Sequence, residues 1–203
     1  MKKWARALYQ PSLPLYGDRH VTGSAEHIAL SREAASEGIV LLKNEEGTLP
    51  LEKKTKTALF GKAVFDYVKG GGGSGDVYAK YVRNFYEGFK EIGAEVFEPA
   101  CDFYRDYVEK MYKEGAAPGM IAEPALDKDL IEDARKFSDT AIFFISRFSG
   151  EGWDRSDVEF TGEPNPWESE VTMPKLAGKI FPKGDFYLTE SEEKLLSDIA
   201  EAF

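Results

Sequence analysis

The sequence is poor in the residues that build disulfide frameworks and metal sites. It contains one cysteine, Cys101, and two histidines, His20 and His27, among 203 residues. A single thiol forms no internal disulfide, and these three residues lack the spacing of a zinc site, so we expect no metal site. We also expect no cofactor. His27 falls in the first turn of an expected helix, where we interpret it as structural.

Positive charge and long apolar runs are also scarce. The formal net charge is −10 at pH 7. Nucleic-acid backbones and anionic membranes attract basic surfaces, so we expect neither as a partner. No stretch has the length of a membrane-spanning helix, and the basic start of the chain lacks the apolar centre of a signal peptide. These absences, together with the unpaired cysteine, favour a cytoplasmic location.

Short apolar strands alternate with amphipathic helices along most of the chain. We expect strands at residues 57–61 and 95–98 and a further one from residue 140. We expect helices at 24–38, 81–92, around 103–111, at 127–137, and from 189 to the end. Thr189 and Glu192 form a capping box for the last helix, which turns Leu195, Leu196, Ile199 and Phe203 to one side. This alternation is typical of a parallel, doubly wound α/β layer.

Residues 156–183 form a long stretch without a helical or strand period. It contains Pro164, Pro166, Pro174 and Pro182. Long aperiodic stretches inside compact domains are usually functional loops or disordered. We interpret this one as a lid or wall over a binding site, with Trp167 as either a residue that stacks on the ligand or a packed loop anchor.

The stretch 145–155, Ile-Ser-Arg-Phe-Ser-Gly-Glu-Gly-Trp-Asp-Arg, follows the expected strand at 140–144. Ligands of α/β sheets bind beyond the carboxyl ends of the strands. Glu151 stands there between two glycines, and Trp153 offers an apolar face beside it. An ordinary charged loop, in which Asp154 pairs with Arg147 or Arg155, explains these residues equally well.

Residues 70–76, Gly-Gly-Gly-Gly-Ser-Gly-Asp, form a glycine-rich stretch with three interpretations. It fits the dinucleotide pattern literally, with Glu95 or Glu98 as the ribose acid, but it starts well beyond the first strand instead of immediately after it. A P-loop is excluded, because no Lys-Ser/Thr follows the glycines. A flexible linker is the second interpretation, and a loop whose glycines let the backbone approach a ligand closely is the third.

Four segments together resemble glycoside hydrolase family 3, the β-glucosidase family. They are the 145–155 stretch, the glycine-rich stretch, Gly38 to Glu45 with the following Leu-Pro-Leu, and Gly-Asp-Phe-Tyr-Leu at 184–188. The resemblance implies a three-layer αβα sandwich with a mostly parallel sheet, the family's second domain. It covers 24–203, apparently truncated at its C-terminal end, with 1–23 as an N-terminal extension. Met1 lies just before the first matching segment, as in members whose sandwich precedes their barrel.

The same resemblance implies the roles of individual residues. Glu151 is the general acid/base, Ser74 contacts the sugar next to the cleaved bond, and Trp153 binds substrate. Family members are retaining enzymes whose second carboxylate, the nucleophile, lies on a (β/α)8 barrel. No barrel pattern exists in this sequence. We therefore expect part of an exo-acting β-glycosidase that acts on β-glucosides or oligosaccharides and is inactive on its own.

Two other functions remain open at this stage. A non-catalytic carbohydrate-binding or interaction module would use the same fold without acid chemistry. A dinucleotide-binding oxidoreductase would use the glycine-rich stretch differently. A truncated sandwich would also leave Phe203 beside an unfilled gap, through which several copies could form a homo-oligomer.

Overall fold

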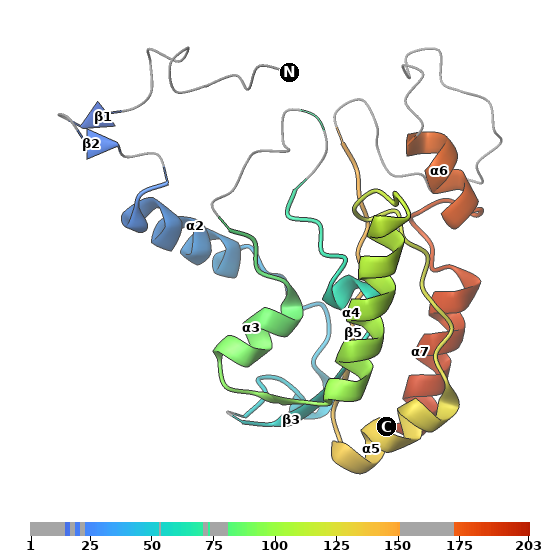
Figure 1. Ribbon diagram of the computed structural model, residues 1–203. Coiled ribbons are helices and arrows are strands. Elements are labelled where there is room, and N and C mark those ends of the chain that lie inside the picture. The colour runs from blue at the N-terminus through green and yellow to red at the C-terminus, as the bar shows by residue number, and fades with distance from the viewer. Residues whose placement is uncertain are drawn as a thin grey trace. The chain divides into compact units, whose positions relative to one another are not determined.

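The computed structural model describes residues 15–16, 19–20, 23–52, 54–70, 73, 81–150 and 173–203 (Figure 1). The chain divides into two compact units, Met1–Pro50 and Leu51–Phe203. Among the helices in these ranges, none combines the length and apolar character needed to cross a bilayer. The predicted boundary at residue 23 and the predicted C-terminal truncation stay predictions.

The first unit contains a short hairpin and one helix. Strands β1 (Leu15–Tyr16) and β2 (Arg19–His20) pair antiparallel. Helix α2 (Ala25–Glu37) begins after Ser24, whose side chain accepts a hydrogen bond from the backbone N–H of His27. Gly38 caps its end, which confirms the helix predicted from Ser24. The short 3-10 helix η1 (Glu45–Gly47) follows.

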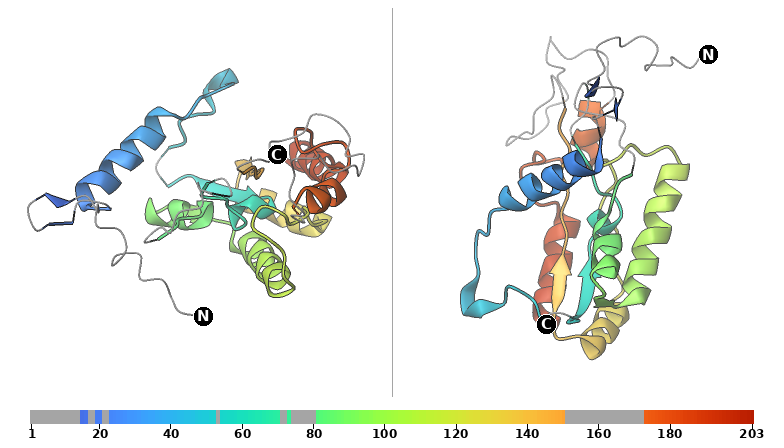
Figure 2. Two further views of the ribbon diagram at one scale, coloured as in Figure 1. Left: turned by 90° about the horizontal axis from the view of Figure 1, so that it is seen from above. Right: turned by 90° about the vertical axis from the view of Figure 1, so that its left-hand side faces the viewer.

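A parallel sheet of three strands forms the centre of the second unit. The central strand is β3 (Lys56–Phe60), flanked by β4 (Glu95–Val96) and β5 (Ala141–Phe143). Both neighbours run parallel to β3, and two further views show the helices packed around this sheet (Figure 2). In the register of β3 and β5, Phe60 lies opposite Phe143. This arrangement confirms the parallel layer predicted from the alternation of strands and helices.

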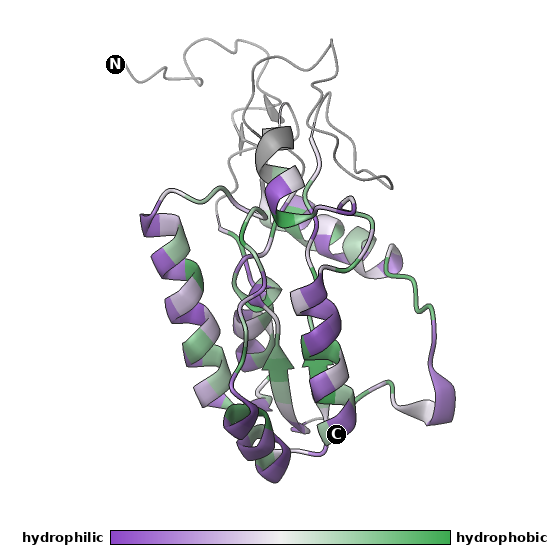
Figure 3. Ribbon diagram, turned by 90° about the vertical axis from the view of Figure 1, so that its right-hand side faces the viewer, coloured by the Kyte–Doolittle hydropathy of each residue, from purple (hydrophilic) through white to green (hydrophobic). Residues whose placement is uncertain are grey.

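Helices cover both faces of this sheet. They are α3 (Phe85–Glu91), α4 (Glu98–Lys113), α5 (Lys128–Phe137) and α7 (Glu190–Ala202). On one face, Ala58 and Phe60 pack against α5, α7 and the Tyr104 side of α4. On the other face, Leu59 packs with Cys101 of α4 and with side chains of α3. The apolar residues gather between the layers (Figure 3), so the domain is the expected αβα sandwich.

Two elements differ from the sequence prediction. Helix α3 begins at Phe85 instead of Tyr81, because Asn84 forms a capping box with Glu87, with the N–H of Glu87 donating at 2.8 Å. Helix α6 (Met173–Ile180) lies inside the stretch expected to be an aperiodic loop, so that interpretation is wrong for these residues. The rest of the loop up to residue 172, including Trp167, lies outside the described residues.

The last helix follows its prediction in part. The capping box of Thr189 and Glu192 is present, and Leu195 and Ile199 are buried. Leu196 is 41% exposed, so its assignment to the buried side is wrong. The ring of Phe203 packs edge-on against Phe60 with centroids 5.9 Å apart. The unfilled gap expected beside Phe203 stays a prediction.

Candidate functional site

The carboxyl ends of β3 and β5 lead into two connections that lie next to each other. The 3-10 helix η2 (Lys62–Val64) follows β3 after Gly61, and residues 144–150 follow β5. We call residues 144–150 the stem, because Gly150 directly precedes Glu151. Glu151, Trp153 and Ser74 themselves lie outside the described residues, so their predicted roles stay predictions.

Gly61 allows these two connections to approach closely. Its φ is +95°, a backbone conformation that side chains disfavour. A Cβ at this position would stand 2.9 Å from the ring of Phe143 and closer still to the carbonyl oxygen of Phe144. The sheet therefore needs glycine at the point where β3 ends.

Lys62 and Asp66 form a buried ion pair beside the stem. Lys62 Nζ lies 2.6 Å from Asp66 Oδ2, and the two side chains are 2% and 0% exposed. The other oxygen of Asp66 accepts hydrogen bonds from the Tyr112 hydroxyl at 2.6 Å and the Gly119 N–H at 2.8 Å. Such bonds are what a buried charge pair requires to be tolerated.

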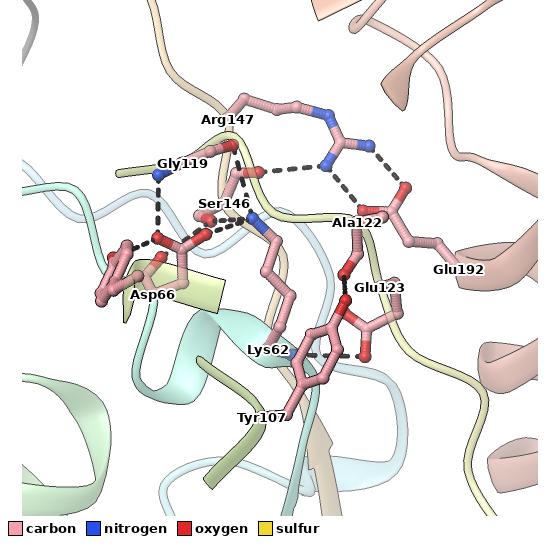
Figure 4. Close-up of polar contacts among 10 residues, drawn as sticks. Lys62, Asp66, Tyr107, Gly119, Ala122, Glu123, Ser146, Arg147 and Glu192 are labelled. Carbon is pink, nitrogen blue, oxygen red and sulfur yellow. Dashed lines mark hydrogen bonds and ion pairs between the residues drawn. The ribbon is translucent and has the colours of Figure 1, made fainter. Parts of the chain in front are cut away.

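This pair also holds the start of the stem. Lys62 Nζ donates to Ser146 Oγ at 3.4 Å, and Ser146 Oγ donates to the carbonyl oxygen of Asp66 at 3.1 Å (Figure 4). Ser146 is thus bound both to the cation of the pair and to the backbone of its anion.

Arg147, the next residue, is bound from the opposite direction. Its Nη1 and Nη2 atoms each donate to one oxygen of Glu192 at 2.7 Å, which makes a bidentate pair (Figure 4). The guanidinium also lies 4.6 Å from the ring centroid of Phe181. The two charged side chains are 7% and 3% exposed. Sequence interpretation offered Asp154 as the partner of Arg147, whereas the structure pairs Arg147 with Glu192.

The carboxylate of Glu192 stays ionised despite its burial. Burial acts to raise its pKa, but the hydrogen bonds from Arg147 and from the backbone N–H of Thr189 outweigh that effect and lower the pKa. The charge of Arg147 is therefore matched within its own pair.

Glu123 is a second buried carboxyl close to the site. Both of its oxygens accept from the backbone N–H of Lys62, at 3.0 and 3.3 Å. Burial raises the pKa of Glu123 to about 7, and the N–H and charge of Lys62 oppose that rise. Sequence analysis missed this residue, because no local pattern marks it.

An apolar hollow of about 610 Å³ lies between the stem and the connection that follows η2. Its lining residues come from that connection, from the segment before α3, from the end of α4 with the loop after it, and from the stem: Tyr67, Val68, Lys69, Gly70, Val82, Tyr112, Ala116, Pro118 and Phe148. Gly119 permits this packing, since a Cβ there would stand 2.8 Å from Phe148 Cβ and 2.9 Å from Val68. Aromatic and apolar walls of this kind suit a small organic ligand. Within the described ranges, no group of three or more His, Cys, Asp or Glu is arranged to hold a metal ion.

Fold and site together define an αβα sandwich domain with an apolar hollow at the carboxyl edge of its parallel sheet. Comparison with known proteins identifies its family. Residues 39–202 match the glycosyl hydrolase family 3 C-terminal domain. The chain belongs to glycoside hydrolase family 3 and carries this domain.

Similar proteins are known at the level of sequence and of structure. The chain is 51% identical to β-glucosidase A of Butyrivibrio fibrisolvens over 207 residues, which cover 100% of this chain and 25% of that protein. It is 39% identical over 137 residues to a β-glucosidase of Ruminococcus albus, covering 64% of this chain and 14% of the relative. β-Glucosidase 3B from Thermotoga neapolitana, solved in complex with α-D-glucose, superposes with a TM-score of 0.69 at 34% identity, covering 93% of this chain and 23% of that one. The chain thus spans about a quarter of the length of the first of these relatives.

Proposed function

We propose that this chain is the acid/base-bearing domain of a larger, exo-acting, retaining β-glucosidase. The enzyme hydrolyses terminal non-reducing β-D-glucosyl residues, with β-glucosides or oligosaccharides as substrates. The names of the relatives support this activity. A cytoplasmic location and assembly into homo-oligomers belong to the same proposal, and cell fractionation and sedimentation of the full-length enzyme test them.

The observation that carries the proposal is the hollow shared by the two connections. Gly70 and Phe148 line the same hollow. Ser74 follows Gly70 in sequence, and Glu151 follows Phe148. The expected sugar contact and the expected proton donor therefore belong to segments that continue from residues lining one apolar hollow near the carboxyl edge of the sheet.

In the proposed mechanism, Glu151 protonates the glycosidic oxygen while a nucleophilic aspartate attacks the anomeric carbon. Glu151 then accepts a proton from the water that releases the sugar. The two carboxyls must lie about 5–5.5 Å apart, and the acid needs a raised pKa. Because Arg147 is paired with Glu192, its positive charge is matched and does not oppose a raised pKa of Glu151. The aspartate comes from a (β/α)8 barrel in another part of the enzyme.

Glu151→Ala in the full-length enzyme tests the acid role. We expect a loss of about 100-fold or more in kcat/KM for alkyl glucosides, because their leaving groups need protonation, and a small loss for 2,4-dinitrophenyl β-glucoside. Glu132→Ala, on the exposed side of α5, is the control and should leave kcat/KM for both substrates unchanged. Equal losses on both substrates would refute the acid role.

The purified 203-residue chain provides a second test. It should not hydrolyse aryl β-glucosides, because it carries the acid without the nucleophile. Measurable turnover by this chain would contradict a nucleophile located on another domain.

The alternative functions predict different results. A non-catalytic module would bind glucose, but Glu151→Ala would leave every activity unchanged. An oxidoreductase would bind NAD in calorimetry, and we expect no binding. The structure weighs against that last alternative, because η2 separates β3 from the glycine-rich stretch and α3 begins only at Phe85. A dinucleotide fingerprint requires an immediate turn from strand to helix.

A further inference from the structure

Arg147 is bonded more completely than an ion pair alone would require. Besides the two bonds to Glu192, Nε donates to the carbonyl oxygen of Asp185 at 2.7 Å. Nη1 and Nη2 donate to the carbonyl oxygens of Ser146 and Tyr187, each at 3.0 Å. A guanidinium has five N–H donors in a rigid planar arrangement, and here every one has an acceptor. The orientation of this side chain is therefore fully determined.

The acceptor of the pair is itself fixed to the sandwich. Glu192 belongs to the capping box of α7, where the N–H of Thr189 donates to Glu192 Oε2 at 2.8 Å. Helix α7 is anchored in the core through Leu195 and Ile199. The stem is thus tied to a packed helix, and functional groups are placed most accurately when rigid elements support them.

The stem is held on its other side by the first ion pair. Ser146 binds Lys62 Nζ and the backbone of Asp66, as Figure 4 shows. Two consecutive residues are therefore bound from two directions shortly before Glu151. The charge of Arg147 is matched by Glu192, so the pair is suited to placing the next residues and not to changing their protonation.

We propose that Arg147 and Glu192 are a positioning pair, which sets where the Glu151 carboxyl stands relative to the glycosidic oxygen. The inference rests on the proposed acid role of Glu151. Misplacement of a catalytic group by about 1 Å can lower a rate about 100-fold. Proton transfer to the leaving oxygen depends on this placement, whereas departure of an activated leaving group does not.

Arg147→Lys in the full-length enzyme tests the pair. Lysine keeps the positive charge but loses the planar set of donors. We expect kcat/KM for methyl β-glucoside to fall about tenfold to 100-fold, with kcat/KM for 2,4-dinitrophenyl β-glucoside nearly unchanged. The basic limb of the pH profile should stay at its wild-type pH, because the pKa of the acid is not altered.

Glu192→Asp is the second variant, since it shortens the side chain by one methylene and keeps the charge. It should change the ratio of the two kcat/KM values in the same direction. This ratio does not depend on the amount of folded enzyme, so partial unfolding cannot imitate the effect. Arg105→Lys is the matched control, because Arg105 also pairs with a carboxylate, Asp102, and also lies over aromatic rings. It should leave the ratio unchanged.

Equal losses on both substrates would overturn the inference and assign the pair to stability alone. Failure of both Arg147→Lys and Glu192→Asp to fold would likewise overturn the inference and assign the pair to stability alone. Glu151→Ala in the same assay separates the two proposals. If it fails to discriminate between the substrates, the acid role falls; if it discriminates while Arg147→Lys does not, only the positioning inference falls.

Discussion

Replacing Glu123 by glutamine should remove a pH dependence of stability that originates next to the site. Burial raises the pKa of the Glu123 carboxyl from 4.5 to about 7. The folded chain therefore keeps this proton at pH values where the unfolded chain has lost it. Stability from this group is complete below pH 4.5, the ordinary value, and declines as the pH rises toward 7.

The size of the effect follows from that shift. A change of one pKa unit corresponds to about 1.4 kcal/mol, so the rise from 4.5 to about 7 corresponds to about 3 kcal/mol. Glutamine keeps an oxygen that can accept from the Lys62 N–H but does not titrate. The wild-type advantage over Glu123→Gln should therefore shrink by about 3 kcal/mol between pH 4.5 and 8.

Urea denaturation followed by circular dichroism at a series of pH values measures this difference. Subtracting the Glu123→Gln curve from the wild-type curve cancels the titration of all other groups. Glu132→Gln, at an exposed position of α5, is the control and should give a curve parallel to wild type. Parallel curves for wild type and Glu123→Gln would refute the buried, proton-binding state of Glu123.

Three further substitutions test the frame of the site by urea denaturation. Gly61→Ala should destabilise the domain by about 3 kcal/mol or more, because it adds strain at positive φ and a collision with Phe144. Gly47→Ala is the control: Gly47 has positive φ but open space around it, so this substitution should cost about 1 kcal/mol. Asp66→Asn should cost about 3–5 kcal/mol by leaving the Lys62 charge uncompensated. A Lys62→Met/Asp66→Leu double variant should recover only part of that loss, because it removes the unpaired charge but leaves the Gly119 N–H and the Tyr112 hydroxyl without their acceptor. Thr189→Ala should cost about 1 kcal/mol through loss of the helix cap, and no measurable change would contradict the capping box.

Much of the fold could be predicted from the sequence, because local signals agree with the tertiary structure. Asp127 caps α5 within one residue of its predicted start. The errors have local causes too. The helical spacing of apolar and aromatic residues continues on the N-terminal side of Asn84 and suggests an earlier start. Asn84 nevertheless caps the helix, so Tyr81 lies in the preceding loop. Helix α6 was hidden by Pro174, although proline is tolerated in the first turn of a helix.

Only those parts of the site that belong to a recognisable sequence motif could be predicted. Family resemblance singled out the 145–155 segment, and the structure confirms that its first residues follow a parallel strand. The partner of Arg147 lies 45 positions away, and nothing in the local pattern of Glu192 beyond its capping role points to it. Long-range pairs of this kind arise from packing, so one sequence without its fold does not reveal them.

Burial of Cys101 between α4 and the sheet has a practical consequence for chemical labelling. Burial raises the pKa of this thiol to about 12, so it keeps its proton and resists alkylating reagents. It is also the single cysteine of the sequence. A cysteine introduced on the surface of this chain would therefore react alone, and a fluorophore or spin probe could be attached there without replacing Cys101.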